Sequence, residues 1–358
     1  MSTVDRAAHT SRVNLGDRSY DVIVGADLLA QVGSFLAGFA VRRGVIFADE
    51  RLESRTDTLS ERLRDAGWEI VVASVPASEE LKSMAGIAGL YDRLIAARVD
   101  RSATIFALGG GTIGDAVGYV AATYQRGLRW VGIPTTLLAQ VDSAIGGKTA
   151  INHPAAKNAI GLVHQPSLVL CDTTFVQTLD ERDRVSGHGE MVKYGLIADA
   201  ALYRALLDRT MPLDASIAAC VEIKARLVER DEQDRTGARA VLNFGHTIGH
   251  AIEQSGGYGT LRHGEAVIYG MRAAVALSAI RGHLDETIAA AIERDLSAIS
   301  VPPITIDPAE IIAAVRHDKK RGSDGRVNFV LLRAIGETLA DNGVHDDDIV
   351  RALARISP

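Results

Sequence analysis

Hydrophobic residues in the first half of the chain come in short runs that alternate with longer segments of mixed polarity. The runs YDVIVG, GVIFADE, EIVVASV, TIFALGGG, WVGIPTT and LVLCDT are rich in valine, isoleucine and leucine, as buried strands are. The segments between them, LSERLRDAG and MAGIAGLYDRLIAARV among them, have the spacing of amphipathic helices. This alternation predicts a largely parallel sheet with helices on its faces.

From about Thr178 onward, the pattern changes to long amphipathic segments with helical spacing, interrupted at Pro302 and Pro303. We find no repeat, low-complexity tract or linker between the two halves. We therefore expect an α/β domain over 1–177 and a mainly α-helical domain over 178–358 that pack together and share a ligand-binding cleft.

The segment GARAVLNFGHTIGHAIE carries a line of polar side chains among apolar neighbours. At positions i, i+4, i+7 and i+11, which lie on one face of a helix, stand Arg239, Asn243, His246 and His250. A guanidinium, an amide and two imidazoles in a mostly buried helix are costly unless they face a ligand or one another. We interpret this line as one wall of an active site.

Histidines and a carboxylate in this region indicate a metal centre. His246 and His250 can share an ion on one helix, and His263 in LRHGEAV offers a third nitrogen. Glu190 in SGHGEMVKYG is a candidate anionic ligand, with Lys193 on the same helix face. Buried histidines that only satisfy one another are the alternative. The combination of a polar line, a second histidine segment and a carboxylate favours a metal, with zinc as the first choice.

The segment ATIFALGGGTIGDAV places three glycines between an expected strand and an expected helix. Gly109, Gly111 and Gly114 have GxGxxG spacing, which lets backbone amides approach a dinucleotide pyrophosphate. No acid follows about 20 residues on, so Asp49 at the end of GVIFADE is the candidate ribose partner. Asp115 can cap the helix or reach the cofactor. A tight structural turn is the alternative reading of the motif.

Composition narrows the classes of ligand. The 358 residues are 47% apolar and 23% charged, which provides a sizeable core and argues against disorder. A net charge of -6 leaves no general basic surface and argues against nucleic acid or an anionic membrane as partner. Basic side chains nevertheless gather near the motifs, which indicates a multiply anionic small molecule. They are Arg126, Lys148, Lys157, Lys193, Lys224 and Arg239.

Two features indicate the compartment. The first residues lack a charged-then-apolar signal pattern, and no run approaches the roughly 18 apolar residues of a spanning helix. Cys171 lies in a strand-like run and Cys220 in a helical pattern, without metal spacing or a disulfide framework. We expect a cytoplasmic protein with two buried thiols.

Long motifs over nearly the whole chain resemble the 3-dehydroquinate synthase family of sugar phosphate cyclases. They run from SYDVIVG through GGGTIGD, RGLRWVGIPTTLLAQVDSAIGGKTAINHPAAKN, GEMVKYGLI, NFGHTIGHAIE and HGEAV to HDKK and FVLLRAIGE. The resemblance implies a dehydroquinate synthase-like fold, with a Rossmann-like NAD-binding α/β domain and a mainly α-helical domain. It also implies a homodimer and one divalent metal, zinc first and cobalt as the alternative. The implied reaction converts 3-deoxy-D-arabino-heptulosonate 7-phosphate, a small anionic sugar acid phosphate, to 3-dehydroquinate and phosphate in the shikimate pathway.

Matched motif by motif, the resemblance implies roles for individual residues. The implied metal ligands are Glu190, His246 and His263, which leaves His250 as a polar or proton-transfer group near the substrate. Substrate contacts are implied for Arg126, Asp142, Lys148, Asn158, Lys193, Lys224, Arg239 and Asn243, with Lys319 or Lys320 of HDKK closing the pocket. Cofactor contacts are implied for Asp49, Glu79, Lys82, Gly111, Asp115, Thr135, Thr136, Lys148, Lys157 and Thr178.

The chain departs from the family pattern in three segments. Residues 77–78 are Ala and Ser where the family usually has Asp and Gly, residues 188–189 are His and Gly where many members have Leu and Ala, and DEQDRTGAR is one residue longer. Another sugar phosphate cyclase is the nearest alternative, although such relatives generally alter DSAIGGKTAINHP. A metal-dependent polyol dehydrogenase of similar fold is less favoured. A non-catalytic scaffold would need damaged ligands, and every matched position is chemically competent.

Overall fold

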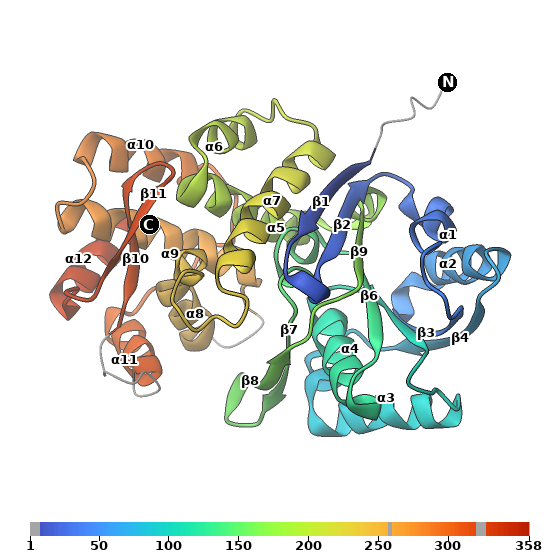
Figure 1. Cartoon of the computed structure of the whole chain (residues 1–358). Helices are drawn as coiled ribbons and strands as arrows, with labels where there is room; N and C mark the ends of the chain where they lie inside the picture. Colours follow the sequence, from blue (N-terminus) through green and yellow to red (C-terminus); the bar gives the residue numbers. More distant parts are fainter. Residues whose placement is uncertain (1–7, 257–259, 320–326, 358) are drawn as a thin grey trace. The chain divides into compact units, whose positions relative to one another are not determined.

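The computed structural model describes residues 8–256, 260–319 and 327–357. Its contacts divide the chain into two compact units (Figure 1). The first comprises Met1–Leu179 and Leu213–Gln233, and the second comprises Asp180–Pro212 and Asp234–Pro358. The first boundary lies two residues from the break expected at 177/178. The sequence pattern did not predict that a later segment returns to the first unit.

A mostly parallel sheet forms the centre of the first unit. Within the described part of the chain it has seven strands in the order β1-β2-β9-β6-β5-β3-β4, and β1 alone runs antiparallel to its neighbour. The strands are β1 (His9–Val13), β2 (Tyr20–Gly25), β3 (Arg43–Asp49), β4 (Glu69–Val75), β5 (Thr104–Gly109), β6 (Arg129–Pro134) and β9 (Leu168–Asp172). All six apolar runs picked out in the sequence form strands of this sheet, which confirms the predicted α/β class.

The helices of this unit lie between its strands or follow them. They are α1 (Val32–Phe35), α2 (Glu53–Asp65), α3 (Met84–Ala96), α4 (Gly111–Thr123) and, from the later segment, α7 (Leu213–Arg230). A separate antiparallel hairpin consists of β7 (Lys148–His153) and β8 (Ala156–Val163). The first unit is therefore a Rossmann-like layer structure with one added hairpin.

Strand β3 shows why these runs lack polar alternation. Val45 and Phe47 join an apolar cluster with α3 and α4, whereas Ile46 and Ala48 join a second cluster with α1 and α2. All four side chains are at most 2% exposed. A strand covered on both faces has to be apolar at successive positions.

Helix α7 completes the first unit by packing against β1 and β2. Glu229 Oε1 accepts hydrogen bonds from the backbone N (2.6 Å) and Nδ2 (2.7 Å) of Asn14. Just after the helix, Glu232 accepts two hydrogen bonds from the guanidinium of Arg18, with Nε–Oε1 at 2.9 Å and Nη2–Oε2 at 2.7 Å. The expected single domain boundary at 177/178 would place this helix in the helical domain instead. Amphipathic spacing predicts that a helix has a buried face, but not which core that face joins.

The second unit is mainly helical, as predicted. Its helices are α5 (Glu181–Ala198), α6 (Ala200–Leu207), α8 (His246–Ser255), α9 (His263–Ile280), α10 (Glu286–Ser297), α11 (Pro308–Lys319) and α12 (Asp346–Ile356), and β10 (Phe329–Ala334) pairs with β11 (Glu337–Asp341). Among the described helices of both units, none combines the length and apolar composition needed to cross a membrane.

Helix α9 is the core of the second unit, with α5, α8, α10, α12 and β10 packed against it (Figure 1). Its sequence is apolar on nearly every face, which is typical of a buried central helix. Two of its glycines allow very close approach. A Cβ at Gly264 would lie 1.9 Å from the carbonyl oxygen of Ser186 in α5, and one at Gly270 would lie 1.9 Å from that of Gly245.

Candidate active site

Three histidines meet in the second unit. His246 is the first residue of α8, His250 lies one turn later, and His263 is the first residue of α9. Each offers a ring nitrogen, and these nitrogens all lie within 4.8 Å of one another. The ring centroids are 5.3 to 5.6 Å apart. The two histidine segments identified in the sequence thus converge on one point.

A buried carboxylate faces two of these imidazoles. The side chain of Glu190, on α5, is fully buried, and its Oε1 lies 3.4 Å from His246 Nε2 and 3.5 Å from His263 Nε2. Its Oε2 forms an ion pair with the ammonium of Lys193, which is 1% exposed. A charge removed from water in this way requires cationic partners.

The remaining nitrogens of the two imidazoles also have partners. Nδ1 of His246 lies 3.1 Å from the backbone oxygen of Phe244, and Nδ1 of His263 lies 3.2 Å from Glu253 Oε2. Both Nδ1 atoms can donate to these oxygen acceptors, and in a neutral ring this leaves Nε2, the nitrogen nearer Glu190, available to a cation. One carboxylate oxygen and two oriented imidazole nitrogens suit a divalent cation such as zinc.

The electrostatics of the two imidazoles differ. Burial, together with the charge of Lys193, lowers the pKa of His246 to about 3. Burial also lowers the pKa of His263, but its hydrogen bonds to Glu190 and Glu253 outweigh that effect and raise the pKa to about 10. The two rings share one carboxylate, so protonation of one disfavours protonation of the other.

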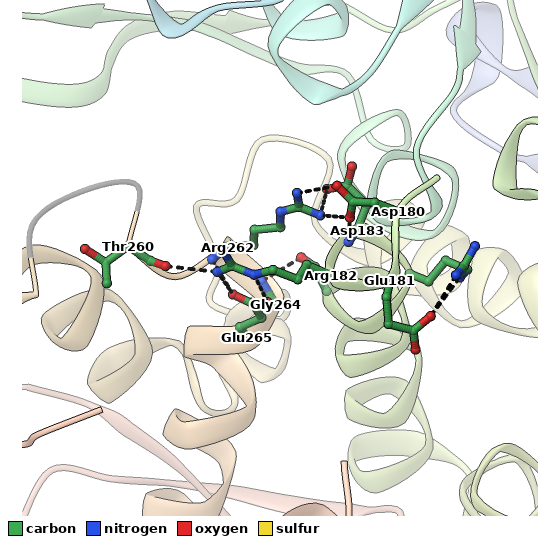
Figure 2. Close-up of polar contacts among 10 residues, drawn as sticks. Asp180, Glu181, Arg182, Asp183, Thr260, Arg262, Gly264 and Glu265 are labelled. Carbon is green, nitrogen blue, oxygen red and sulfur yellow. Dashed lines mark hydrogen bonds and ion pairs between the residues drawn. The ribbon is translucent and has the colours of Figure 1, made fainter. Parts of the chain in front are cut away.

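Arginine–carboxylate pairs join the start of α5 to the start of α9 (Figure 2). Arg182 donates from Nε to Glu265 Oε1 (2.8 Å) and from Nη2 to Oε2 (2.6 Å). Glu265, 1% exposed, also accepts from the backbone N of Arg262 at 2.7 Å. Arg262 in turn donates from Nη2 to Asp180 Oδ2 at 2.6 Å, and this hydrogen bonding lowers the pKa of Asp180. These contacts fix His263 beside the helix that carries Glu190.

The expected polar line is not on one helix. Arg239, 4% exposed, precedes a 3-10 turn over Ala240–Asn243, and Asn243 is exposed. Gly245 then adopts φ +79° before α8 begins at His246. The prediction of a continuous helix through all four residues was therefore wrong, because a left-handed glycine separates the turn from the helix. Arg239 lies in the same unit as the histidines.

In the first unit, the carboxyl ends of β5 and β6 surround the glycine motif. Gly109 ends β5, opposite Pro134 at the end of β6, and α4 starts at Gly111. A small hollow there is lined by Gly109, Gly110, Gly111, Gly114, Asp115, Pro134, Ser143 and Lys148, among others. A Cβ at Gly111 would lie 3.0 Å from Ser143 Oγ, so a larger residue would crowd the hollow. Bare backbone at a helix N-terminus is suited to a pyrophosphate.

A buried lysine links three of the predicted contact residues. Lys82, 5% exposed, donates from Nζ to Asp115 Oδ2 (2.7 Å) and Asn158 Oδ1 (2.5 Å). Burial, only partly offset by Lys82, raises the pKa of Asp115. Glu79 Oε2 accepts from Asn152 Nδ2 at 2.7 Å. The altered residues 77–78 therefore precede a pair, Glu79 and Lys82, that is engaged with the hairpin and α4.

A second lysine of the first unit comes from α7. Lys224, 5% exposed, donates from Nζ to the backbone oxygen (2.5 Å) and Oδ1 (2.6 Å) of Asp142. These two predicted substrate contacts are distant in sequence and adjacent in space. Lys224 can reach Asp142 because α7 packs in the first unit.

The other predicted contacts of the first unit have separate settings. Asp49, at the end of β3, is 4% exposed and accepts from Arg51, with Nη2–Oδ2 at 2.6 Å. Three threonines are engaged locally: the backbone N of Thr135 donates to Gly109 O (3.0 Å), Thr136 Oγ1 accepts from Ala139 N (3.2 Å), and Thr178 Oγ1 donates to Phe175 O (2.7 Å). The remaining predicted contacts of this unit are exposed: Arg126, Lys148, Lys157 and Asn158.

Lys320 lies outside the described residues, as does the side chain of Lys319. Cys171 and Cys220 are buried thiols, as expected. Sequence reasoning missed Arg182, Glu253 and Glu265. Of these, only Glu265 had a local signal, because it stands at the third position of α9, where an acid often caps a helix.

Comparison with known proteins gives consistent matches. A family model described as "3-dehydroquinate synthase N-terminal" matches residues 72–186, and one described as "3-dehydroquinate synthase C-terminal" matches 187–321. Curated relatives named 3-dehydroquinate synthase include those of Desulforamulus reducens, 39% identical over 97% of this chain and 99% of the relative, and Rhodospirillum rubrum, 43% identical over 91% and 89%.

Solved structures with the same fold include two synthases with bound NAD+. 2-Epi-5-epi-valiolone synthase from Streptomyces hygroscopicus subsp. jinggangensis, with NAD+ and Zn2+ bound, is 29% identical with a TM-score of 0.84, covering 96% of this chain and 98% of that one. 2-Deoxy-scyllo-inosose synthase, complexed with carbaglucose-6-phosphate, NAD+ and Co2+, is 24% identical with a TM-score of 0.85, covering 97% and 99%. A probable glycerol dehydrogenase from Sinorhizobium meliloti shares the fold more distantly, at TM-score 0.61.

Proposed function

Because this chain belongs to the 3-dehydroquinate synthase family, we propose that it converts 3-deoxy-D-arabino-heptulosonate 7-phosphate to 3-dehydroquinate and phosphate. The overall change is a transient oxidation with NAD, loss of phosphate, return of the hydride and an intramolecular aldol closure. The observation that carries the proposal is the convergence of Glu190, His246 and His263 in a chain that matches the family over nearly its whole length. Zinc as the resident metal, a homodimeric state and a cytoplasmic location are further parts of the proposal.

The metal would be held by Glu190, His246 and His263. Support comes from the fully buried carboxylate, whose Oε1 lies within 3.5 Å of both Nε2 atoms, and from the Nδ1 partners that orient both rings. When bound, a divalent cation would acidify a ligated substrate alcohol and favour its oxidation. His250 would remain for the substrate, where a neutral imidazole can move a proton between hydroxyl groups. The rival ligand set is the three histidines without Glu190.

The cofactor would use the first unit. Backbone amides at 109–111 and the start of α4 would receive the pyrophosphate, and Asp49 would accept from a ribose hydroxyl. The contact of Lys82 with Asp115 and Asn158 would hold the edge of this site in place. The remaining cofactor contacts of the proposal are Glu79, Thr135, Thr136, Lys148, Lys157 and Thr178.

The proposed contacts of the substrate's carboxylate and phosphate are mainly basic groups. Lys193 and Arg239 are nearly fully buried in the second unit, and Lys224 is nearly fully buried in the first. Lys224 is already held by Asp142, so little side-chain freedom is left to lose on binding. Arg126, Lys148, Asn158, Asn243 and one of Lys319 and Lys320 complete the proposed contacts. Holding both anionic ends fixes one conformer while the leaving phosphate itself takes the proton.

A direct assay tests this function. Purified protein with NAD and Zn²⁺ is incubated with the seven-carbon acid phosphate, and phosphate, cyclised product and NADH are followed together. We expect equal amounts of phosphate and product and no net NADH, because the hydride returns to the substrate. His263→Ala, purified and loaded in the same way, should release no phosphate.

Substrate controls separate the competing enzymes. Phosphate release from glucose 6-phosphate or a neutral seven-carbon ketose phosphate, with none from the acid phosphate, would identify another cyclase. Net NADH from glycerol would identify a polyol dehydrogenase. Either result contradicts the proposed reaction.

A further inference from the structure

Glu253, the partner of His263 Nδ1, is an acid on α8 that is not among the proposed metal, cofactor or substrate contacts. It stands seven positions after His246 and three after His250, so all three lie on one side of the helix. Its side chain is 16% exposed, and its Oε2 lies 3.2 Å from His263 Nδ1. Helix α8 therefore carries one proposed ligand and also contacts a second that belongs to α9.

The contact determines which nitrogen of His263 is available. A histidine that binds a metal through Nε2 keeps its one proton on Nδ1, and the carboxylate of Glu253 is placed to accept that proton in a hydrogen bond. That Nε2 is the atom 3.5 Å from Glu190 Oε1. Without an acceptor at Nδ1, the ring could place its proton on either nitrogen.

His263 depends on such a partner more than His246 does. The side chain of His263 is 31% exposed, against 13% for His246. Packing therefore restrains the His263 ring less, and a hydrogen bond is needed to hold its orientation. The two outer partners also differ in charge, because His246 has a neutral backbone carbonyl whereas His263 has a carboxylate. A charged partner makes the opposite ring nitrogen a stronger donor to a metal.

We infer that Glu253 is a positioning residue that orients His263 and strengthens its Nε2 as a metal ligand. The inference rests on the metal assignment in the proposed function. It does not depend on which sugar phosphate the enzyme cyclises.

Metal affinity measured without substrate or NAD tests this inference. Metal-free wild type, Glu253→Ala, Glu253→Gln and His263→Ala are titrated with Zn²⁺ against a chromophoric chelator at one pH. Loss of an outer carboxylate typically weakens metal binding about 10–100-fold, and we expect that loss for Glu253→Ala. Glu253→Gln should recover part of it, because its amide oxygen still accepts from Nδ1 but carries no charge. Co²⁺-loaded samples should show shifted visible absorption bands in both Glu253 variants.

Asp341→Asn provides the matched control. Asp341 Oδ2 lies 2.8 Å from His283 Nε2 in the same unit, so this variant also removes a carboxylate–histidine pair. It should leave Zn²⁺ affinity and the Co²⁺ spectrum unchanged. Glu253→Ala with wild-type affinity and spectrum would refute the inference even if its melting temperature fell, because a purely structural role predicts that pattern.

The outcomes also separate this inference from the proposed function. If His263→Ala binds Zn²⁺ as tightly as wild type, the ligand assignment fails and the role of Glu253 fails with it. If the affinities follow the expected order but the acid phosphate is not cyclised, the role of Glu253 stands and the proposed reaction is wrong.

Discussion

Gly264→Ala is the substitution that most sharply tests how the two ligand-bearing helices are joined. An added Cβ would lie 1.9 Å from the carbonyl oxygen of Ser186, and 2.5 and 2.7 Å from its C and Cα. All three are backbone atoms, so no side-chain rotation relieves the clash. Real Cβ atoms essentially never come within 3.0 Å of such neighbours, so α5 and α9 would have to separate by roughly 1 Å.

The structure allows the size of the effect to be estimated. Overpacking costs about 1–3 kcal/mol in free energy of unfolding and occasionally more, and the backbone clash puts this case near the upper end. For a unit of this size, such a loss lowers the melting temperature by roughly 6–12 °C. The substitution also moves His263, the preceding residue, relative to Glu190, one turn after Ser186 on α5. We therefore expect weaker Zn²⁺ binding as well as lower stability.

Differential scanning calorimetry and chelator competition measure the two effects. Gly89→Ala is the matched control, because Gly89 lies inside α3 with nothing within 4 Å of an added Cβ. Alanine there should stabilise the helix by about 0.5–1 kcal/mol. A Gly264→Ala protein that melts at the wild-type temperature and binds Zn²⁺ equally well would refute the reasoning.

Three further predictions concern single side chains of the second unit. Arg239→Lys should raise KM for the acid phosphate about tenfold or more, because an ammonium cannot reproduce a two-pronged contact with a carboxylate or phosphate; unchanged steady-state kinetics would exclude that role. His250→Ala should retain Zn²⁺ on metal analysis but turn over slowly, whereas loss of the metal would favour the three-histidine ligand set. Asp341→Asn should lower the melting temperature at pH 7 but progressively less as the pH falls. Burial raises the pKa of Asp341, but its hydrogen bonds with His283, the backbone of Gly343 and Arg281 outweigh burial and lower it. Its stabilising effect is therefore present above the unfolded pKa of about 3.9 and is lost as the pH falls through the lower folded value. A melting difference independent of pH would contradict this.

The strands of the sheet were predictable because burial on both faces requires a run of apolar residues, which is visible in the sequence. Strands such as β3 and β5 are apolar at successive positions, which is typical of short strands covered on both faces. The break between the turn at Ala240–Asn243 and helix α8 was not predictable from the same pattern. Apolar spacing continues through the segment, but it does not register that Gly245 has a positive φ. The return of α7 to the first unit was hidden for a related reason, since its sequence is compatible with either core.

Only part of the site could be predicted from the sequence. His246, His263 and Glu190 were identified because histidine and glutamate are common metal ligands and because these residues lie in long family motifs. The structure brings these three together, while the role of each remains a prediction. Arg182 and Glu253 look like ordinary charged residues of amphipathic helices. Their roles depend on partners that lie far away in sequence or on another element. Such pairs become visible only when the helices are placed.

The return of Leu213–Gln233 to the first unit constrains how this polypeptide can mature during translation. When the ribosome has released only the residues up to Leu179, Asn14 and Arg18 still lack Glu229 and Glu232, and β1 still lacks its covering helix. By the time residue 233 emerges, α5 and α6 are already outside the exit tunnel. The nascent chain therefore cannot finish one unit before starting the other. A gene fragment that stops after 179 should yield an aggregation-prone product, whereas most N-terminal domains fold as they are made.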